Sequence, residues 1–121
     1  TNVYPMNTKY KFIFVWIVLL CFSQKSQATI YYADALNGAD TNNGLFKVHS
    51  SGMDGPKRTI TSCLVSAASG DTIMVAAGMY AETLDLDKPI TLLGNNHDIS
   101  AKGTRNAESV LLPEGILINS P

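Results

Sequence analysis

The acidic side chains between residues 82 and 87 are the densest group that could do chemistry. Asp85 and Asp87 alternate with Leu84 and Leu86, and Glu82 precedes them. This alternation places both aspartates on one face of a strand. Paired carboxylates bind calcium or carry out acid–base chemistry. Acids on the solvent-facing side of a strand explain the same pattern, so we assign them no catalytic role.

The segment from Asp40 to Gly44 is partly like the start of a calcium loop. An EF-hand loop has an acidic or Asn side chain at its fifth position, glycine at its sixth and glutamate at its twelfth. Here these positions hold Gly44, Leu45 and Ser51. We therefore expect a plain turn.

The histidines and serines give no pattern typical of a catalytic or metal site. His49 and His97 are far apart in the sequence, and we expect both at the surface. The nucleophile elbow G-x-S-x-G, the G-x-G-x-x-G motif and the P-loop do not occur in the sequence. We predict no catalytic, cofactor-binding or metal-binding residue in this chain, and Lys88 and Arg105 receive no catalytic role.

Tyrosines and one polar segment remain as candidates for ligand contact. Tyr31, Tyr32 and Tyr80 could stack on sugar rings, although tyrosines more often pack in cores or at corners. The polar segment 95–108 is where we most expect a ligand contact, because loops often carry binding residues. Its polar side chains include those of Lys102, Arg105 and Asn106.

Composition and charge exclude several classes of protein. The chain has 121 residues, of which 45% are hydrophobic, with 9 basic and 10 acidic residues. It is therefore neither a disordered tail nor a basic nucleic-acid binder. Its 2 cysteines are too few for a disulfide-stapled miniprotein or a cysteine-rich zinc site.

The N-terminal segment has the pattern of an export signal. An uncharged apolar run spans Phe12–Phe22, Lys9 and Lys11 precede it, and Ser26-Gln27-Ala28 follows. A basic start, a short apolar core and a small-x-small exit are typical of a secretory signal peptide. We predict a signal peptide over residues 1–28, cleaved after Ala28, and a secreted or cell-surface protein.

Other interpretations of this segment fit less well. A membrane-spanning helix needs about 20 apolar residues, and a lipoprotein signal needs a small residue before its cysteine, where Leu20 precedes Cys21. Met6 is the expected start. Removal of residues 1–28 leaves six basic and ten acidic residues, so we expect neither nucleic acid nor a membrane surface as a partner. It also leaves Cys63, which we expect as a small buried side chain on a helix.

The rest of the sequence predicts a strand, a loop, one helix and then short strands. Residues 29–33 are β-branched and aromatic, which favours a strand. Residues 34–54 are rich in turn-forming residues. The spacing of Ile60, Cys63, Leu64 and Ala67 predicts a helix over 59–69, with Thr59 as N-cap and Gly70 just beyond its end. We expect further strands at 71–76, 82–87, 90–93, 110–112 and 116–118, with a turn at 77–80.

Apolar positions in these strands recur at one spacing. Ile73, Leu92 and Leu111 are each 19 residues apart. A repeat of about 20 residues with tight turns favours a solenoid of stacked coils. A β-sandwich remains an alternative, although it would show more hairpin turns.

Several motifs together resemble the start of the pectate-lyase-like group of proteins, over about Ile30 to Asn119. The motifs are a Tyr-Tyr strand with a polar loop, a helix start, a strand, a corner and a second strand. In this chain they are Tyr31-Tyr32, Pro56-Lys57-Arg58-Thr59-Ile60, Gly70-Asp71-Thr72-Ile73, Gly78-Met79-Tyr80-Ala81-Glu82 and Ile90-Thr91-Leu92-Leu93-Gly94.

The resemblance implies an all-β fold, a right-handed parallel β-helix. Residues 29–70 would form an N-terminal strand, loop and capping helix, and residues 71–121 the first coils of a longer, truncated protein. The group includes polysaccharide lyases and glycoside hydrolases, so the resemblance implies polysaccharide binding or degradation, with the active site outside this segment. The alternative is a non-enzymatic surface or adhesin-type structural protein. We expect a monomer, no cofactor in this segment, and calcium only in the full-length protein.

Overall fold

The computed structural model of the chain describes residues 9, 13, 16, 26–112 and 116–117, and for 116–117 the backbone alone. Most of the predicted export signal lies outside the described residues, including Met6, Cys21 and most of Phe12–Phe22. Within the described part, no helix is both long enough and apolar enough to cross a membrane.

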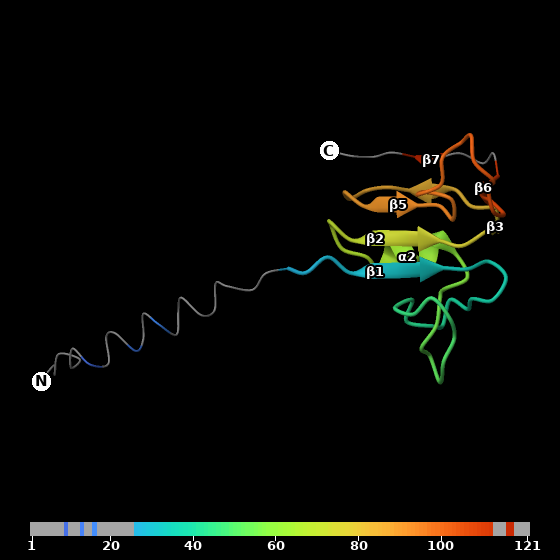
Figure 1. Ribbon diagram of the computed structural model, residues 1–121. Coiled ribbons are helices and arrows are strands. Elements are labelled where there is room, and N and C mark those ends of the chain that lie inside the picture. Colours follow the sequence, from blue (N-terminus) through green and yellow to red (C-terminus); the bar gives the residue numbers. More distant parts are fainter. Residues whose placement is uncertain (1–8, 10–12, 14–15, 17–25, 113–115, 118–121) are drawn as a thin grey trace, which may run out of the picture.

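One short helix and seven short strands make up the described domain (Figure 1). In chain order they are β1 (Ile30–Ala33), α2 (Ile60–Ser66), β2 (Thr72–Val75), β3 (Gly78–Tyr80), β4 (Leu84–Asp85), β5 (Thr91–Leu93), β6 (Ser109–Leu111) and β7 (Ile116–Leu117). The helix and most of the strands lie inside the predicted segments. Residues 77–80, expected as a turn, contain β3, and the strand expected over 82–87 is reduced to β4.

The strands pair in parallel and form three small sheets. The largest has the order β1-β2-β5, with Tyr31 opposite Ile73 and Ile73 opposite Leu92. The other two are the pairs β3-β6 and β4-β7. Figure 1 shows β1, β2 and β5 side by side, with α2 behind β1 and β2.

The fold class predicted from the sequence, an all-β right-handed parallel β-helix, is wrong. The described residues form a small mixed α/β domain in which short strands make three small sheets, and these strands close no solenoid. The apparent repeat fails at its third member. Leu92 lies opposite Ile73, but Leu111 lies opposite Tyr80 in a different sheet. An apolar residue at a fixed spacing therefore did not imply an equivalent position in a repeated coil.

Helix α2 begins as predicted and ends early. The hydroxyl of Thr59 accepts a hydrogen bond from Ser62 N at 3.1 Å, which satisfies one of the free amides of the first turn. Its apolar face buries Ile60, Cys63 and Leu64. The helix stops at Ser66 because Ala67 adopts extended backbone, with φ −76° and ψ 148°. Gly70, with φ 89°, lies in the turn that leads to β2.

The core lies between α2 and the sheets. Its buried members are Ala33, Ile60, Cys63, Leu64, Ala67, Ile73, Val75, Tyr80 and Leu84. Leu92 and Leu111 pack against this cluster and remain partly exposed. The inward residues of β1 and β2 alternate with Tyr32 and Met74, so these two side chains lie on the outer face of the largest sheet.

Candidate functional site

The acidic group predicted between residues 82 and 87 does not form one site. Glu82 turns to the N-terminus of α2, where its carboxylate oxygens accept hydrogen bonds from Ile60 N at 3.0 Å and Thr61 N at 2.9 Å. Asp85 and Asp87 are exposed and line a shallow hollow beside the helix with Lys88. Within the described part of the chain, no group of three or more His, Cys, Asp or Glu side chains is placed to hold a metal ion.

The positively charged side chain of Lys57 reaches into the turn from Asp40 to Gly44. The ammonium group of Lys57, which is 7% exposed, donates to the carbonyl oxygen of Asn42 at 2.6 Å and to that of Asp40 at 3.1 Å. The carboxylate of Asp40 accepts from the backbone amides of Arg58 and Thr59. These hydrogen bonds attach the loop to the segment that leads into α2.

Cys63 is fully buried on α2, which confirms its predicted place. Burial raises the pKa of its thiol to about 12. The Sγ atom lies 3.5 Å from the carbonyl oxygen of Tyr32. Because the thiolate is the nucleophilic form of cysteine, a thiol with this raised pKa is a poor nucleophile at neutral pH.

The candidate tyrosines occupy different environments. Tyr80 is 2% exposed, and its hydroxyl donates to Ala76 O at 3.0 Å, while Ala35 N donates to it at 3.2 Å. Its burial raises the pKa of the phenol. Tyr31 packs against the core and donates to Ser66 O at 3.2 Å. Tyr32 alone among these three lies on the outer face of the sheet, partly exposed.

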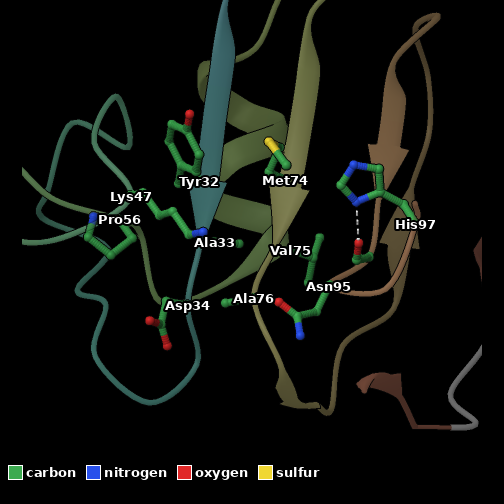
Figure 2. A pocket seen from close by; sticks show the side chains of 11 residues that line it. Tyr32, Ala33, Asp34, Lys47, Pro56, Met74, Val75, Ala76, Asn95 and His97 are labelled. Atoms are coloured by element: carbon green, nitrogen blue, oxygen red, sulfur yellow. Dashed lines mark hydrogen bonds between the residues drawn. The ribbon is translucent and has the colours of Figure 1, made fainter. Parts of the chain in front are cut away.

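Tyr32 lines a hollow that we call the Tyr32 pocket (Figure 2). The hollow has a volume of about 100 Å³ and lies where β1 and β2 end. Its side-chain groups include those of Tyr32, Asp34, Lys47, Met74, Asn95 and His97. Figure 2 shows Lys47 beside β1 and His97 on the opposite side, with Tyr32 and Met74 on the sheet between them. Two separate loops therefore supply its walls.

Hydrogen bonds fix the polar groups of the two walls. His97 Nδ1 lies 2.8 Å from Gly94 O, and its Nε2 lies 2.8 Å from a carboxylate oxygen of Asp98. The carboxylate of Asp34 accepts from Leu36 N at 2.9 Å and from Asn37 N at 3.0 Å. Partial burial opposes ionisation of Asp34, but these hydrogen bonds outweigh it and lower its pKa. Asp34 is therefore an ionised acceptor at neutral pH.

The arrangement can bind a ligand from one side. Small-molecule pockets that enclose their ligands have volumes of about 300–1,000 Å³, whereas this hollow has about 100 Å³. A ligand would keep most of its surface outside. The groups present are an aromatic ring, a thioether, a cation, a carboxylate, an amide and an imidazole. They offer apolar contact and hydrogen bonds in both directions.

The Tyr32 pocket overlaps in part with the segment singled out from the sequence. The segment 95–108 was expected to contact a ligand, and its residues Asn95 and His97 line the pocket. Its cations do not: Arg105 pairs with Glu108 at 2.6 Å, and Lys102 lies outside the pocket. Lys47 was missed, because nothing in a loop of turn-forming residues indicates that it folds back to Tyr32.

Comparison with protein-family models gave no match. Comparison with curated proteins and comparison with solved structures gave no significant match either.

Proposed function

We propose that this chain belongs to an exported protein that binds polysaccharide, and that the Tyr32 pocket contacts one sugar unit of the polymer. The observation that carries the proposal is Tyr32 itself, a partly exposed aromatic ring on the outer face of a sheet, with polar side chains on both sides. The motif resemblance described above motivates polysaccharide as the ligand class.

The pocket has the two kinds of group that a sugar ring requires. One face of a pyranose ring carries C–H groups, which pack on an aromatic ring, and its hydroxyl groups both donate and accept hydrogen bonds. Tyr32 and Met74 supply the apolar contact. Lys47 and Asn95 supply donors, and Asp34 and the Asn95 amide oxygen supply acceptors.

The small volume favours a polymer bound from the side. A hollow of about 100 Å³ cannot enclose a whole sugar ring. A unit within a chain needs no enclosure, because neighbouring units continue along the surface. The carboxylate of Asp34 is held by its turn in the ionised state, so it does not supply a proton to a leaving group. We therefore assign binding, and no bond cleavage, to this pocket.

Affinity electrophoresis of the full chain through gels containing single soluble polysaccharides tests the proposal. We expect at least one neutral or acidic polysaccharide to retard the wild-type chain. Tyr32→Ala should weaken the interaction about tenfold, since an aromatic contact contributes up to about 1.4 kcal/mol beyond its buried area. Met79→Ala is the matched control, because Met79 is 66% exposed on β3 and lies outside the pocket. Unretarded wild-type chain across the panel, or equal retardation of wild type and Tyr32→Ala, would overturn the proposal.

A further inference from the structure

The residue after the predicted cleavage site is held at both of its backbone polar atoms. Thr29 N donates to Asp71 Oδ1 at 2.8 Å, and Thr29 O accepts from Thr72 N at 2.9 Å. The next residue, Ile30, opens β1, which pairs with β2 from Thr72 onward. The nitrogen atom of Thr29 is therefore fixed at the point where the first strand joins the sheet.

Asp71 presents a buried carboxylate to this nitrogen atom. The residue is 6% exposed, and its second carboxylate oxygen accepts from Ala68 N at 2.8 Å. Its own backbone carbonyl accepts from Thr91 N at 3.0 Å, which fixes Asp71 between β2 and β5. The hydrogen bonds from Ala68 and Thr29 lower the pKa of Asp71, and the charge of Lys88 adds to this effect. Asp71 is therefore ionised at neutral pH.

No full positive charge among the described residues directly contacts this carboxylate. Arg105, a cation among the described residues, pairs with Glu108 and not with Asp71. Lys88 acts on Asp71 from a distance. Its ammonium group donates a hydrogen bond to Ala67 O at 2.5 Å. Within the described part of the chain, backbone amides contact the Asp71 carboxylate, and no counter-ion touches this buried negative charge.

The peptide bond between Ala28 and Thr29 follows an accessible segment. Ser26, Gln27 and Ala28 are exposed and have no regular secondary structure. This is the small-x-small stretch in which the sequence predicts removal of the export signal. The bond predicted to break therefore joins an exposed residue to a nitrogen atom that already lies on Asp71.

We propose that cleavage after Ala28 creates an α-ammonium group at Thr29 that forms an ion pair with Asp71, so that processing stabilises the attachment of β1 to the domain. In the cleavage, a water molecule attacks the carbonyl carbon of Ala28 and the C–N bond to Thr29 breaks. Ala28 leaves with a new carboxylate, and the nitrogen of Thr29 gains protons and becomes –NH₃⁺. The hydrogen bond at 2.8 Å, which already has an ionised acceptor, then joins two opposite charges.

The ion pair gives the processed chain a specific pH dependence. A free α-amino group has a pKa of about 7.7–8.0, and the facing carboxylate of Asp71 raises it, while the more distant Lys88 opposes this. The stabilisation is therefore complete between about pH 4, above which Asp71 is ionised, and about pH 7.7, and it is lost as the pH rises through the raised pKa of the folded state. The uncut chain has no α-ammonium at this position and lacks this dependence.

The test compares the same full-length chain before and after a cut. A site-specific protease sequence replaces residues 23–28, so that cutting leaves Thr29 as the first residue. We expect the melting temperature to rise by about 4 °C or more on cutting at about pH 6.5, and the gain to disappear at about pH 10. An unchanged or lower melting temperature after cutting would overturn the proposal.

Two controls separate the ion pair from the mere loss of the leader. Acetylation of the cut chain at Thr29 keeps an N–H donor but removes the charge, and it should abolish the gain. Asp71→Asn should abolish it too, whereas Asp87→Asn, which changes an exposed acid, should retain it. If the melting temperature of the cut chain stays raised after acetylation, the proposal is contradicted, even if Asp71→Asn fails to fold. Export of the natural sequence followed by N-terminal sequencing should give Thr29, and another first residue would overturn the assigned cleavage site.

Discussion

The ammonium group of Lys57 lies 2.6 Å from the carbonyl oxygen of Asn42, so a buried cation holds the loop that forms one wall of the Tyr32 pocket. The same ammonium group reaches Asp40 O at 3.1 Å. The amide of Asn42 adds a bond to Pro56 O at 2.9 Å, and Pro56 itself lines the pocket. The position of this wall therefore depends on Lys57 and Asn42, which do not line the pocket.

Lys57→Met should destabilise the domain. The substitution keeps an unbranched side chain but leaves two carbonyl groups without their donor, at a cost of about 2 kcal/mol. Urea unfolding measured by circular dichroism checks this. Lys47→Met is the matched control, since Lys47 is exposed and should change the free energy of unfolding by less than about 0.5 kcal/mol. Equal stability of the two variants would contradict the assigned role of Lys57.

Glu82→Ala should weaken the start of α2. The carboxylate of Glu82 accepts from Ile60 N and Thr61 N, and the loss of such a cap costs about 1 kcal/mol. The measurement is the midpoint of thermal unfolding, with Asp87→Ala as the control on an exposed neighbour. If Asp87→Ala lowers the midpoint as much as Glu82→Ala does, the capping role is wrong.

Local structure was predictable from the sequence where local chemistry decides it. Thr59 caps the helix as expected, and the apolar spacing of Ile60, Cys63 and Leu64 marked its buried face. The fold class was not predictable, because the partners of β6 are set by contacts across about 30 residues: Leu111 lies opposite Tyr80.

At the candidate site, too, the sequence indicated some features and not others. The sequence marked Tyr32 as a residue able to stack on sugars and the segment 95–108 as a binding loop. It did not indicate which of the three tyrosines lies on the outer face of the sheet, since that depends on which face of β1 the helix covers. The sequence also grouped Glu82 with Asp85, although Glu82 is required elsewhere as a helix cap.

The thiol of Cys63 should be inert in the folded chain. Burial raises its pKa to about 12, so the fraction of thiolate is very small at about pH 8. In a Cys21→Ser background, Ellman's reagent should react with no thiol in native buffer and with one in denaturant. Rapid reaction in native buffer would contradict the burial of Cys63 on α2.

Asp71 should make the stability of the uncut chain sensitive to acid. Hydrogen bonds from Ala68 and Thr29 lower its pKa below the ordinary value of 3.8. Its contribution is therefore present above about pH 4 and is lost as the pH falls through the lowered pKa of the folded state. The difference in melting temperature between wild type and Asp71→Asn should shrink as the pH falls below 3.8. A difference that is constant or grows with acid would contradict this assignment.

Isothermal titration of a polysaccharide that retards the wild-type chain tests the central claim, binding at the Tyr32 pocket, most directly. Wild type and Met79→Ala should bind with equal affinity, since Met79 lies outside the pocket. Tyr32→Ala should bind about tenfold more weakly, with a melting temperature close to that of wild type because the ring of Tyr32 lies outside the core. Equal affinity of Tyr32→Ala and wild type would contradict the account.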